Sequence, residues 1–265
     1  MDSFQIAISD WAAFSPRRMQ RDQWLAWAEG NDGRESGEHK PELPWVSPML
    51  RRRLSPMGRA ALWAAGQLLD DQRGEPVATI FASRHGEVGR TVKLMRELAV
   101  ESPLSPASFS LSVHNAIGGI HSIANQVFSP VTAISAGPDT LSAALLEAYT
   151  QLVCAGRGAG VAGEGAEVLC VFYDDSLPDP LGGFNEQEAQ VQALALRVTL
   201  PGAAEGVPLA FTLSEGPYTS ENPSDSGSAQ VDSFLRFLLD DEQSNLELRG
   251  GKRLWQWCKR DRISA

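Results

Sequence analysis

The residues best placed to do chemistry lie where a predicted strand turns sharply into a predicted helix. The strand covers residues 131–135, the turn reads Ala136-Gly137-Pro138-Asp139, and apolar residues follow at helical spacing: Leu141, Ala144, Leu145, Ala148 and Leu152. A nucleophile at such an elbow would face the positive end of the helix, which lowers the pKa of a thiol. The three cysteines of the chain lie elsewhere, at Cys154, Cys170 and Cys258. The segment therefore has the frame of an acyl-transfer site without the group that would react.

The elbow residues Gly137, Pro138 and Asp139 also have a simple structural interpretation. Proline is favoured in the first turn of a helix, because its φ is preset and that position needs no N–H donor. An aspartate in the same turn is stabilised by the positive end of the helix dipole. We therefore interpret Pro138 and Asp139 mainly as helix-capping residues. In the alternative interpretation, the Asp139 carboxylate occupies the anion-favouring position that a thiolate or an oxyanion would use.

The histidines are the other candidates for a reactive group. His114 and Asn115 precede a segment rich in glycine and alanine, and we interpret them as a helix cap and an interface contact. The alternative is a hydrolytic pair of His114 with Ser112 or Ser135. Neither serine lies in a G-x-S-x-G sequence, which disfavours a serine hydrolase. We expect His85, which follows a predicted strand, to lie on the surface.

Strands that alternate with helices predict a layered α/β fold. Strands are predicted at residues 4–8, 76–83, 131–135 and 167–173, and helices at 56–69 and 89–100. Farther along, strands are predicted at 191–200 and 209–213, the first as an edge strand, and a helix at 231–239. We expect one domain over residues 1–175 and a C-terminal extension over 176–265. The extension would include a flexible loop near 218–228 and a short aromatic, basic tail.

Composition restricts the classes of function. The 265 residues are 43% hydrophobic and 21% charged, an ordinary globular balance. A net charge of −10 argues against nucleic acid or an anionic membrane as a partner. The cysteines lack the paired spacing of a disulfide framework or a zinc site, and no stretch reads as a signal peptide or a membrane span. We therefore expect a cytoplasmic protein without a metal or a cofactor.

Two residue types carry further expectations about burial. Cys154 and Cys170 have apolar neighbours, so we expect both to be buried and inert, with Cys258 as the exposed cysteine. The tryptophans near the start of the chain, Trp11, Trp24 and Trp27, predict either core packing or a partner interface.

Several segments, taken in order, resemble the N-terminal half of a β-ketoacyl synthase, an enzyme with a thiolase fold. LSPMGRAALWAA at 54–65 resembles its early helix, and VATIFASRHGEV at 77–88 the strand and glycine turn that follow. The helical segment of a ketosynthase that precedes its active-site strand corresponds to VHNAIGG at 113–119, and that strand corresponds to SPVTAISAG at 129–137. The position of the active-site cysteine then falls on or next to Pro138. GAGVAGEGAE at 158–167 resembles the next strand-and-glycine piece. The resemblance covers roughly residues 5–175 and is specific through the order of its parts.

Within this group, the chain is similar to the short β-ketoacyl synthase-like N-terminal family. Its members occur as chain-length-factor-like partners of complete ketosynthases in aryl polyene and similar type II fatty-acid or polyketide pathways. The resemblance implies a thiolase-like half-fold, with helices packed on a mixed sheet. It also implies a catalytically inactive subunit, because the elbow cysteine and the two histidines that the second half of a ketosynthase supplies are both missing. The four histidines of this chain are His39, His85, His114 and His121.

The implied partner is a complete ketosynthase, whose acyl tunnel this subunit would shape, with an acyl carrier protein involved indirectly. Family members pair through the strand before the elbow and the preceding helical segment. Carried over, the interface would include His114, Asn115, Ile117, His121, Thr132, Ile134 and Ser135. Two alternatives remain. One is an independent enzyme that acts on acyl thioesters through Ser135 or Asp139 with His114, and the other is a scaffold that binds a carrier protein without chemistry.

Overall fold

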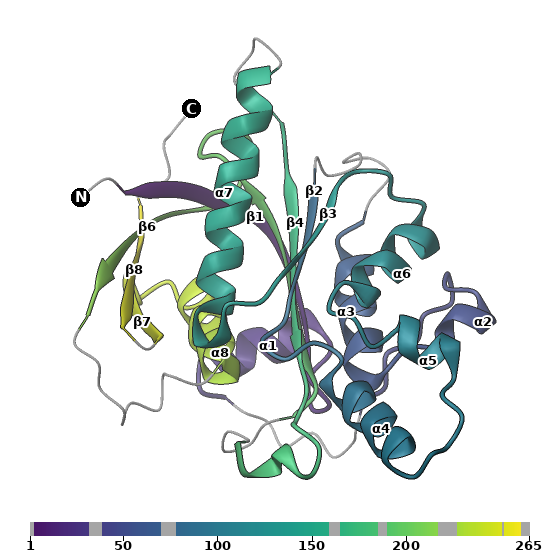
Figure 1. Ribbon diagram of the computed structural model, residues 1–265. Coiled ribbons are helices and arrows are strands. Elements are labelled where there is room, and N and C mark those ends of the chain that lie inside the picture. Colours follow the sequence, from purple (N-terminus) through teal and green to yellow (C-terminus); the bar gives the residue numbers. More distant parts are fainter. Residues whose placement is uncertain are drawn as a thin grey trace.

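The computed structural model describes residues 3–31, 39–69, 78–158, 165–184, 190–216, 227–250 and 252–260. Within these ranges the chain forms an eight-stranded sheet with helices on both faces (Figure 1). The predicted loop near 218–228 lies outside the described residues as far as residue 226, and helix α8 begins at Gly227.

The sheet is mixed, as the family resemblance implies. β2 (Ala78–Ala82) runs parallel to β3 (Val131–Ile134) and to β4 (Val168–Asp174). The other neighbours are antiparallel, and they extend the sheet through β5 (Gln192–Thr199), β1 (Phe4–Phe14), β6 (Val207–Glu215), β8 (Arg253–Lys259) and β7 (Asn245–Gly250). The order across the sheet is β3-β2-β4-β5-β1-β6-β8-β7, so β3 and β7 are its edges.

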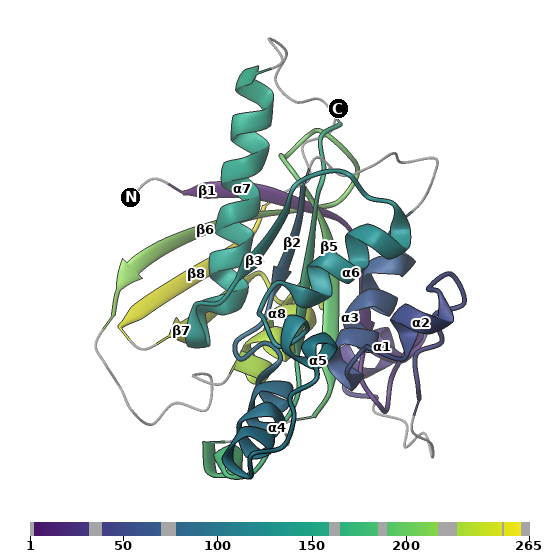
Figure 2. The same cartoon turned by 45° about the vertical axis from the view of Figure 1, so that its right-hand side comes forward.

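The helices bury the two faces of this sheet in separate cores. α3 (Pro56–Gln67) and α6 (Ala116–Asn125) cover one face, and α7 (Thr140–Gly158) and α8 (Gly227–Leu239) cover the other (Figures 1 and 2). β4 serves both cores, because successive side chains of a strand point to opposite faces. Cys170 and Phe172 face α7, whereas Val171 and Tyr173 face α3.

Small residues allow the helices to lie close to the sheet and to each other. Ala60, Ala61, Ala64 and Ala65 of α3 are fully buried. A Cβ atom at Gly118 of α6 would stand 2.7 Å from a methyl carbon of Val131, so α6 lies directly on β3. The remaining helices are short or peripheral: α1 (Arg21–Ala28), α2 (Pro48–Arg51), α4 (Val88–Ala99), α5 (Pro106–Ser110), and the 3-10 turns η1 (Gly137–Asp139) and η2 (Leu181–Phe184).

The C-terminal part of the chain differs from the sequence expectations in two ways. β5 is a central strand between β4 and β1, not an edge strand, and its Arg197 is buried because it pairs with Glu167 and donates to the Leu68 carbonyl. The stretch expected to be a short tail is strand β8, which pairs with β7 and β6. The strands that follow residue 176 therefore belong to the same sheet as β2, β3 and β4.

Candidate functional site

The carboxyl ends of β2, β3 and β4 meet at one end of the sheet, where a polar turn connects them. This turn, Ser83–Gly86, follows β2 and is held by the carboxylate of Asp174 at the end of β4. Asp174 accepts the Ser83 hydroxyl at 2.7 Å and the backbone N–H groups of Arg84 and His85 at 3.1 and 3.4 Å. Burial raises the pKa of Asp174 to about 6, although these hydrogen bonds act in the opposite direction.

The predicted polar candidates His114 and Ser135 contact this turn rather than each other. The His114 ring nitrogen Nε2 lies 2.9 Å from the Ser83 carbonyl, and the Ser135 hydroxyl donates to the Arg84 carbonyl at 2.9 Å. Gly86 has a φ of +58°, and a Cβ atom there would stand 2.7 Å from the His114 ring. Each side chain is therefore already engaged in holding the turn, and His85 is exposed, as expected.

The elbow that follows β3 is built as a 3-10 turn before α7 rather than as the first turn of that helix. Gly137 has a φ of +58°, a conformation that glycine adopts without steric cost. Thr140 then bridges the turn, because its hydroxyl accepts the Ala136 N–H at 3.0 Å and donates to the Gly137 carbonyl at 2.7 Å. Pro138 and Asp139 thus lie in η1, just before the first residue of α7.

Asp139 is buried, and its carboxylate is bound by the C-terminal hairpin. The indole N–H of Trp255 donates to its Oδ1 at 2.8 Å, and the Arg253 guanidinium lies 3.2 Å from its Oδ2. Gly250 packs so closely that a Cβ atom there would stand 1.9 Å from Oδ1. Asp139, beside the position where a ketosynthase would carry its cysteine, is therefore a buried carboxylate that β7 and β8 hold in place.

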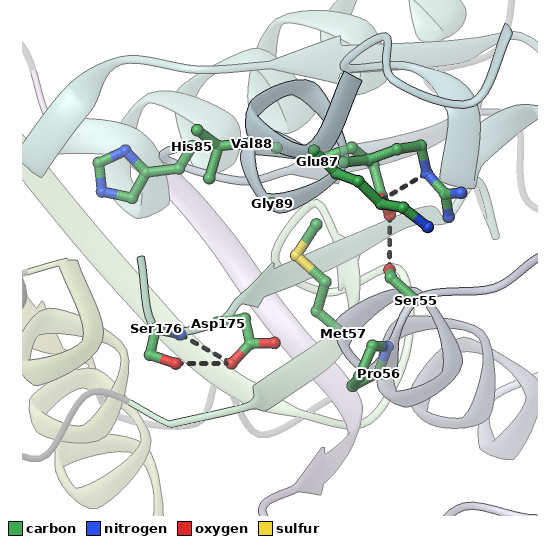
Figure 3. Close-up of a pocket in the computed structure, with 12 residues that line it drawn as sticks. Ser55, Pro56, Met57, His85, Glu87, Val88, Gly89, Asp175 and Ser176 are labelled. Carbon is green, nitrogen blue, oxygen red and sulfur yellow. Dashed lines mark hydrogen bonds and ion pairs between the residues drawn. The ribbon is translucent and has the colours of Figure 1, made fainter. Parts of the chain in front are cut away.

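A cavity of about 280 Å³ lies beside the Ser83–Gly86 turn, and His85 and Gly86 form part of its lining (Figure 3). Met57 and Val88, from the first turns of α3 and α4, supply apolar walls. Glu87 is buried beside it, where it accepts the Ser55 hydroxyl at 2.6 Å and pairs with Arg90 at 3.2 Å. Figure 3 shows Asp175 and Ser176 hydrogen-bonded to each other along another wall. Glu87 and Arg90 of this lining are thus paired with each other.

Comparison with known proteins assigns the family. The profile of the β-ketoacyl synthase N-terminal domain matches residues 24–258, which is most of the chain. The chain belongs to this family. No curated protein matches its sequence.

Solved structures of ketosynthase-like proteins have the same fold. A chain of the ketosynthase ApeO in complex with its chain length factor ApeC, from Xenorhabdus doucetiae, is 26% identical with a TM-score of 0.76, and the match covers 96% of this chain and 99% of that one. The ishigamide ketosynthase/chain length factor is 14% identical with a TM-score of 0.54, over 81% of this chain and 64% of that one. A β-ketoacyl synthase from Burkholderia phymatum is 13% identical with a TM-score of 0.54, over 88% and 69%. The chain thus has the thiolase-like half-fold of this family.

The residues expected at a ketosynthase interface divide into two groups. Ile117 and His121 of α6 are buried within this subunit, and His121 packs on Phe81 with ring centroids 5.1 Å apart. Burial lowers the pKa of His121 to about 4, so its imidazole is neutral at physiological pH. The other five remain accessible: Asn115 and Ser135 are exposed, and His114, Thr132 and Ile134 are half-buried. Of the seven expected residues, these five are therefore the ones that a partner could contact directly.

The cysteines and the C-terminal hairpin correct the sequence expectations. Cys154 is exposed, not buried, and Cys258 is half-buried, while Cys170 is buried as expected. The missed residues at the elbow are Trp255 and Arg253, although the alternating apolar residues Leu246, Leu248, Trp255 and Trp257 around two glycines do signal a hairpin. Among the described residues, no group of histidine, cysteine and acidic side chains could hold a metal ion, and no helix has the length and apolarity to cross a membrane.

Proposed function

We propose that this chain is a non-catalytic, chain-length-factor-like subunit. It pairs with a complete ketosynthase in fatty-acid, polyketide or aryl polyene biosynthesis, and it shapes the partner's acyl tunnel. The partner supplies the chemistry in the cytoplasm, and an acyl carrier protein delivers substrate to that partner. The observation that supports this role most strongly is the occupied elbow, where the buried Asp139 carboxylate is held by Trp255 and Arg253.

The elbow geometry argues against covalent catalysis by this subunit. A nucleophile needs a free lone pair and a nearby base that is oriented toward it. His114, Ser135 and Asp139 each bind a different structural partner: the Ser83 carbonyl, the Arg84 carbonyl and the Trp255 indole. No hydrogen bond joins any two of these three residues in the described part of the chain. A carboxylate that is buried and ion-paired is also a weak nucleophile.

The edge strand β3 offers the backbone groups that a second subunit would need. The Pro130 and Ile134 carbonyls accept the N–H groups of Thr79 and Ser83, at 2.9 and 3.1 Å. Backbone groups alternate in direction along a parallel ladder, so those of Val131 and Ala133 point away from β2. An exposed edge of this kind is a template for pairing with another chain.

Apolar side chains surround this edge on the α6 side. Ile123 of α6 is 67% exposed, and Phe128, in the connection between α6 and β3, is 88% exposed. Figures 1 and 2 both show α6 beside β3. Large apolar side chains exposed together beside an open strand edge favour a protein partner. Side chains at this boundary would then set how far an acyl chain can extend.

Two proline variants of β3 test the pairing. Ala133→Pro removes an N–H that points outward, and proline is tolerated at such edge positions. We expect it to keep the melting temperature of the isolated chain and to abolish co-purification with the tagged ketosynthase encoded beside it. Thr132→Pro removes an N–H that points toward β2 and should instead lower the melting temperature. Wild-type protein that never co-purifies, or an Ala133→Pro variant that pairs as well as wild type, would refute the proposed interface.

A further inference from the structure

A second cavity uses none of the residues of the elbow or of the Ser83–Gly86 turn. It lies between α1, the second half of β1 and the C-terminal end of α3, and its volume is about 300 Å³. Each of these elements contributes one indole ring to the wall: Trp24 from α1, Trp11 from β1 and Trp63 from α3. Polar side chains also line the cavity: Gln20, Arg21 and Gln67. The predicted tryptophan cluster is therefore partly core and partly the wall of a cavity.

Hydrogen-bond donors in this wall remain without acceptors. The Trp24 N–H is satisfied, because it donates to the Ala13 carbonyl at 2.9 Å. Trp63 is only 7% exposed, yet its indole N–H bonds to no described residue and is not sealed from the outside. The Trp11 indole and the Gln67 amide also bond to no described group. These N–H groups can be reached from the cavity, so an acceptor that enters it can bond to them in place of water.

Among the residues that line the cavity, Arg21 carries the charge, and it is paired with the Asp10 carboxylate. The Arg21 guanidinium lies 4.7 Å from the centre of the Trp11 ring, and that of Arg18 lies 5.4 Å from the centre of the Trp24 ring. One nitrogen of Arg21, Nη2, donates hydrogen bonds to the Asp10 carboxylate and to the Trp11 carbonyl. Its other two nitrogens bond to no described residue and can reach a ligand.

We propose that this cavity binds a small planar aromatic carboxylate of one or two rings. Indole faces favour a flat π system, because stacked and edge-to-face arrangements add to the burial of apolar area. A guanidinium with free N–H groups, an amide and two indole donors match a carboxylate, whose oxygens only accept hydrogen bonds. The volume suits a ligand of this size rather than a long acyl chain.

Titration of the full chain with 2-naphthoate tests this proposal, with calorimetry and tryptophan fluorescence as readouts. We expect saturable 1:1 binding, and affinity for the matched cation 2-naphthylmethylammonium lower by roughly tenfold or more. Arg21→Gln and Trp63→Phe should each raise the Kd for 2-naphthoate by roughly fivefold or more, since each removes donors. Trp45→Phe, which changes an indole outside this cavity, should leave the Kd unchanged.

Thermal melts of each variant separate a lost contact from a lost fold. If Trp63→Phe does not fold, Gln67→Leu on the exposed end of α3 carries the same comparison. The proposal is overturned by the absence of saturable binding up to millimolar 2-naphthoate, by equal affinity for the naphthyl cation, or by an equal loss in Trp45→Phe.

Discussion

Trp255 donates its indole N–H to the Asp139 carboxylate at 2.8 Å, which joins two positions 116 residues apart in the chain. The bond connects β8, near the end of the protein, to the elbow that precedes α7. Both side chains are buried, so the carboxylate is stabilised by its partners and not by water. The elbow residue therefore acts as an anchor for the C-terminal hairpin.

Removal of this anchor should destabilise the hairpin. Asp139→Ala leaves the buried Trp255 N–H unpaired, and we expect the free energy of unfolding to fall by about 2–4 kcal/mol. Hydrogen exchange should accelerate first in β7 and β8. The matched control is Glu247→Ala, which removes an exposed carboxylate paired with Arg249 in the same hairpin and should cost less than about 1 kcal/mol. Equal losses in chemical denaturation of the two variants would contradict the anchor.

Gly250 gives an independent measure of the same contact. A methyl group there would overlap the Asp139 carboxylate, so Gly250→Ala should destabilise the chain by about 1–3 kcal/mol. The double variant with Asp139→Ala should lose clearly less free energy of unfolding than the sum of the two single losses, because it lacks the carboxylate that the new methyl group would overlap. Additive losses in urea unfolding would show that Gly250 and Asp139 do not contact each other in solution.

Two titratable groups, the half-buried Asp174 and the buried His121, should give opposite pH dependences of stability. The pKa of Asp174 is raised to about 6, so the folded state holds its proton more tightly than the unfolded state, and this contribution to stability falls as pH rises from about 4 to 6. The pKa of His121 is lowered to about 4, so the unfolded state takes up the proton first, and this contribution rises with pH between about 4 and 6.5. In the wild-type chain the two effects largely cancel.

Single variants should separate the two effects. In Asp174→Asn the His121 contribution remains, and we expect the free energy of unfolding to increase by about 1–3 kcal/mol from pH 4 to 6.5, relative to wild type. In His121→Phe the slope relative to wild type should have the opposite sign. Urea unfolding at several pH values measures both slopes, and two slopes of the same sign would show that at least one of the two pKa values is not shifted in the stated direction.

The strands as far as β6 and the elbow could be predicted from the sequence, whereas the hairpin of β7 and β8 and the long-range partners could not. The apolar run of β4 is readable because both of its faces are buried. The alternation in β5 predicts an edge strand, whereas the structure places β5 centrally and buries Arg197 through its pairing with Glu167. The same limit applies to Asp139, since helix capping accounts for its position locally while Trp255 and Arg253 come from the distant hairpin.

Cys154 shows a different kind of error, which concerns the face of a helix. Its sequence neighbours are apolar, but it lies two positions after the buried Leu152, which places it on the opposite side of α7. We therefore expect maleimide to label Cys154 rapidly in the native protein. Cys170 should react only after unfolding, since burial raises the pKa of its thiol. Peptide mapping by mass spectrometry measures both rates, and labelling of Cys170 before Cys154 would contradict their assigned positions.

The intact mass of each subunit after incubation with an acyl thioester tests the absence of catalysis most directly. Our account predicts that the ketosynthase partner gains one acyl group while this chain keeps its mass, and that this chain alone neither binds the acyl group covalently nor hydrolyses the thioester. Acylation of this chain, or thioester hydrolysis by it that is lost in His114→Ala, would contradict the account.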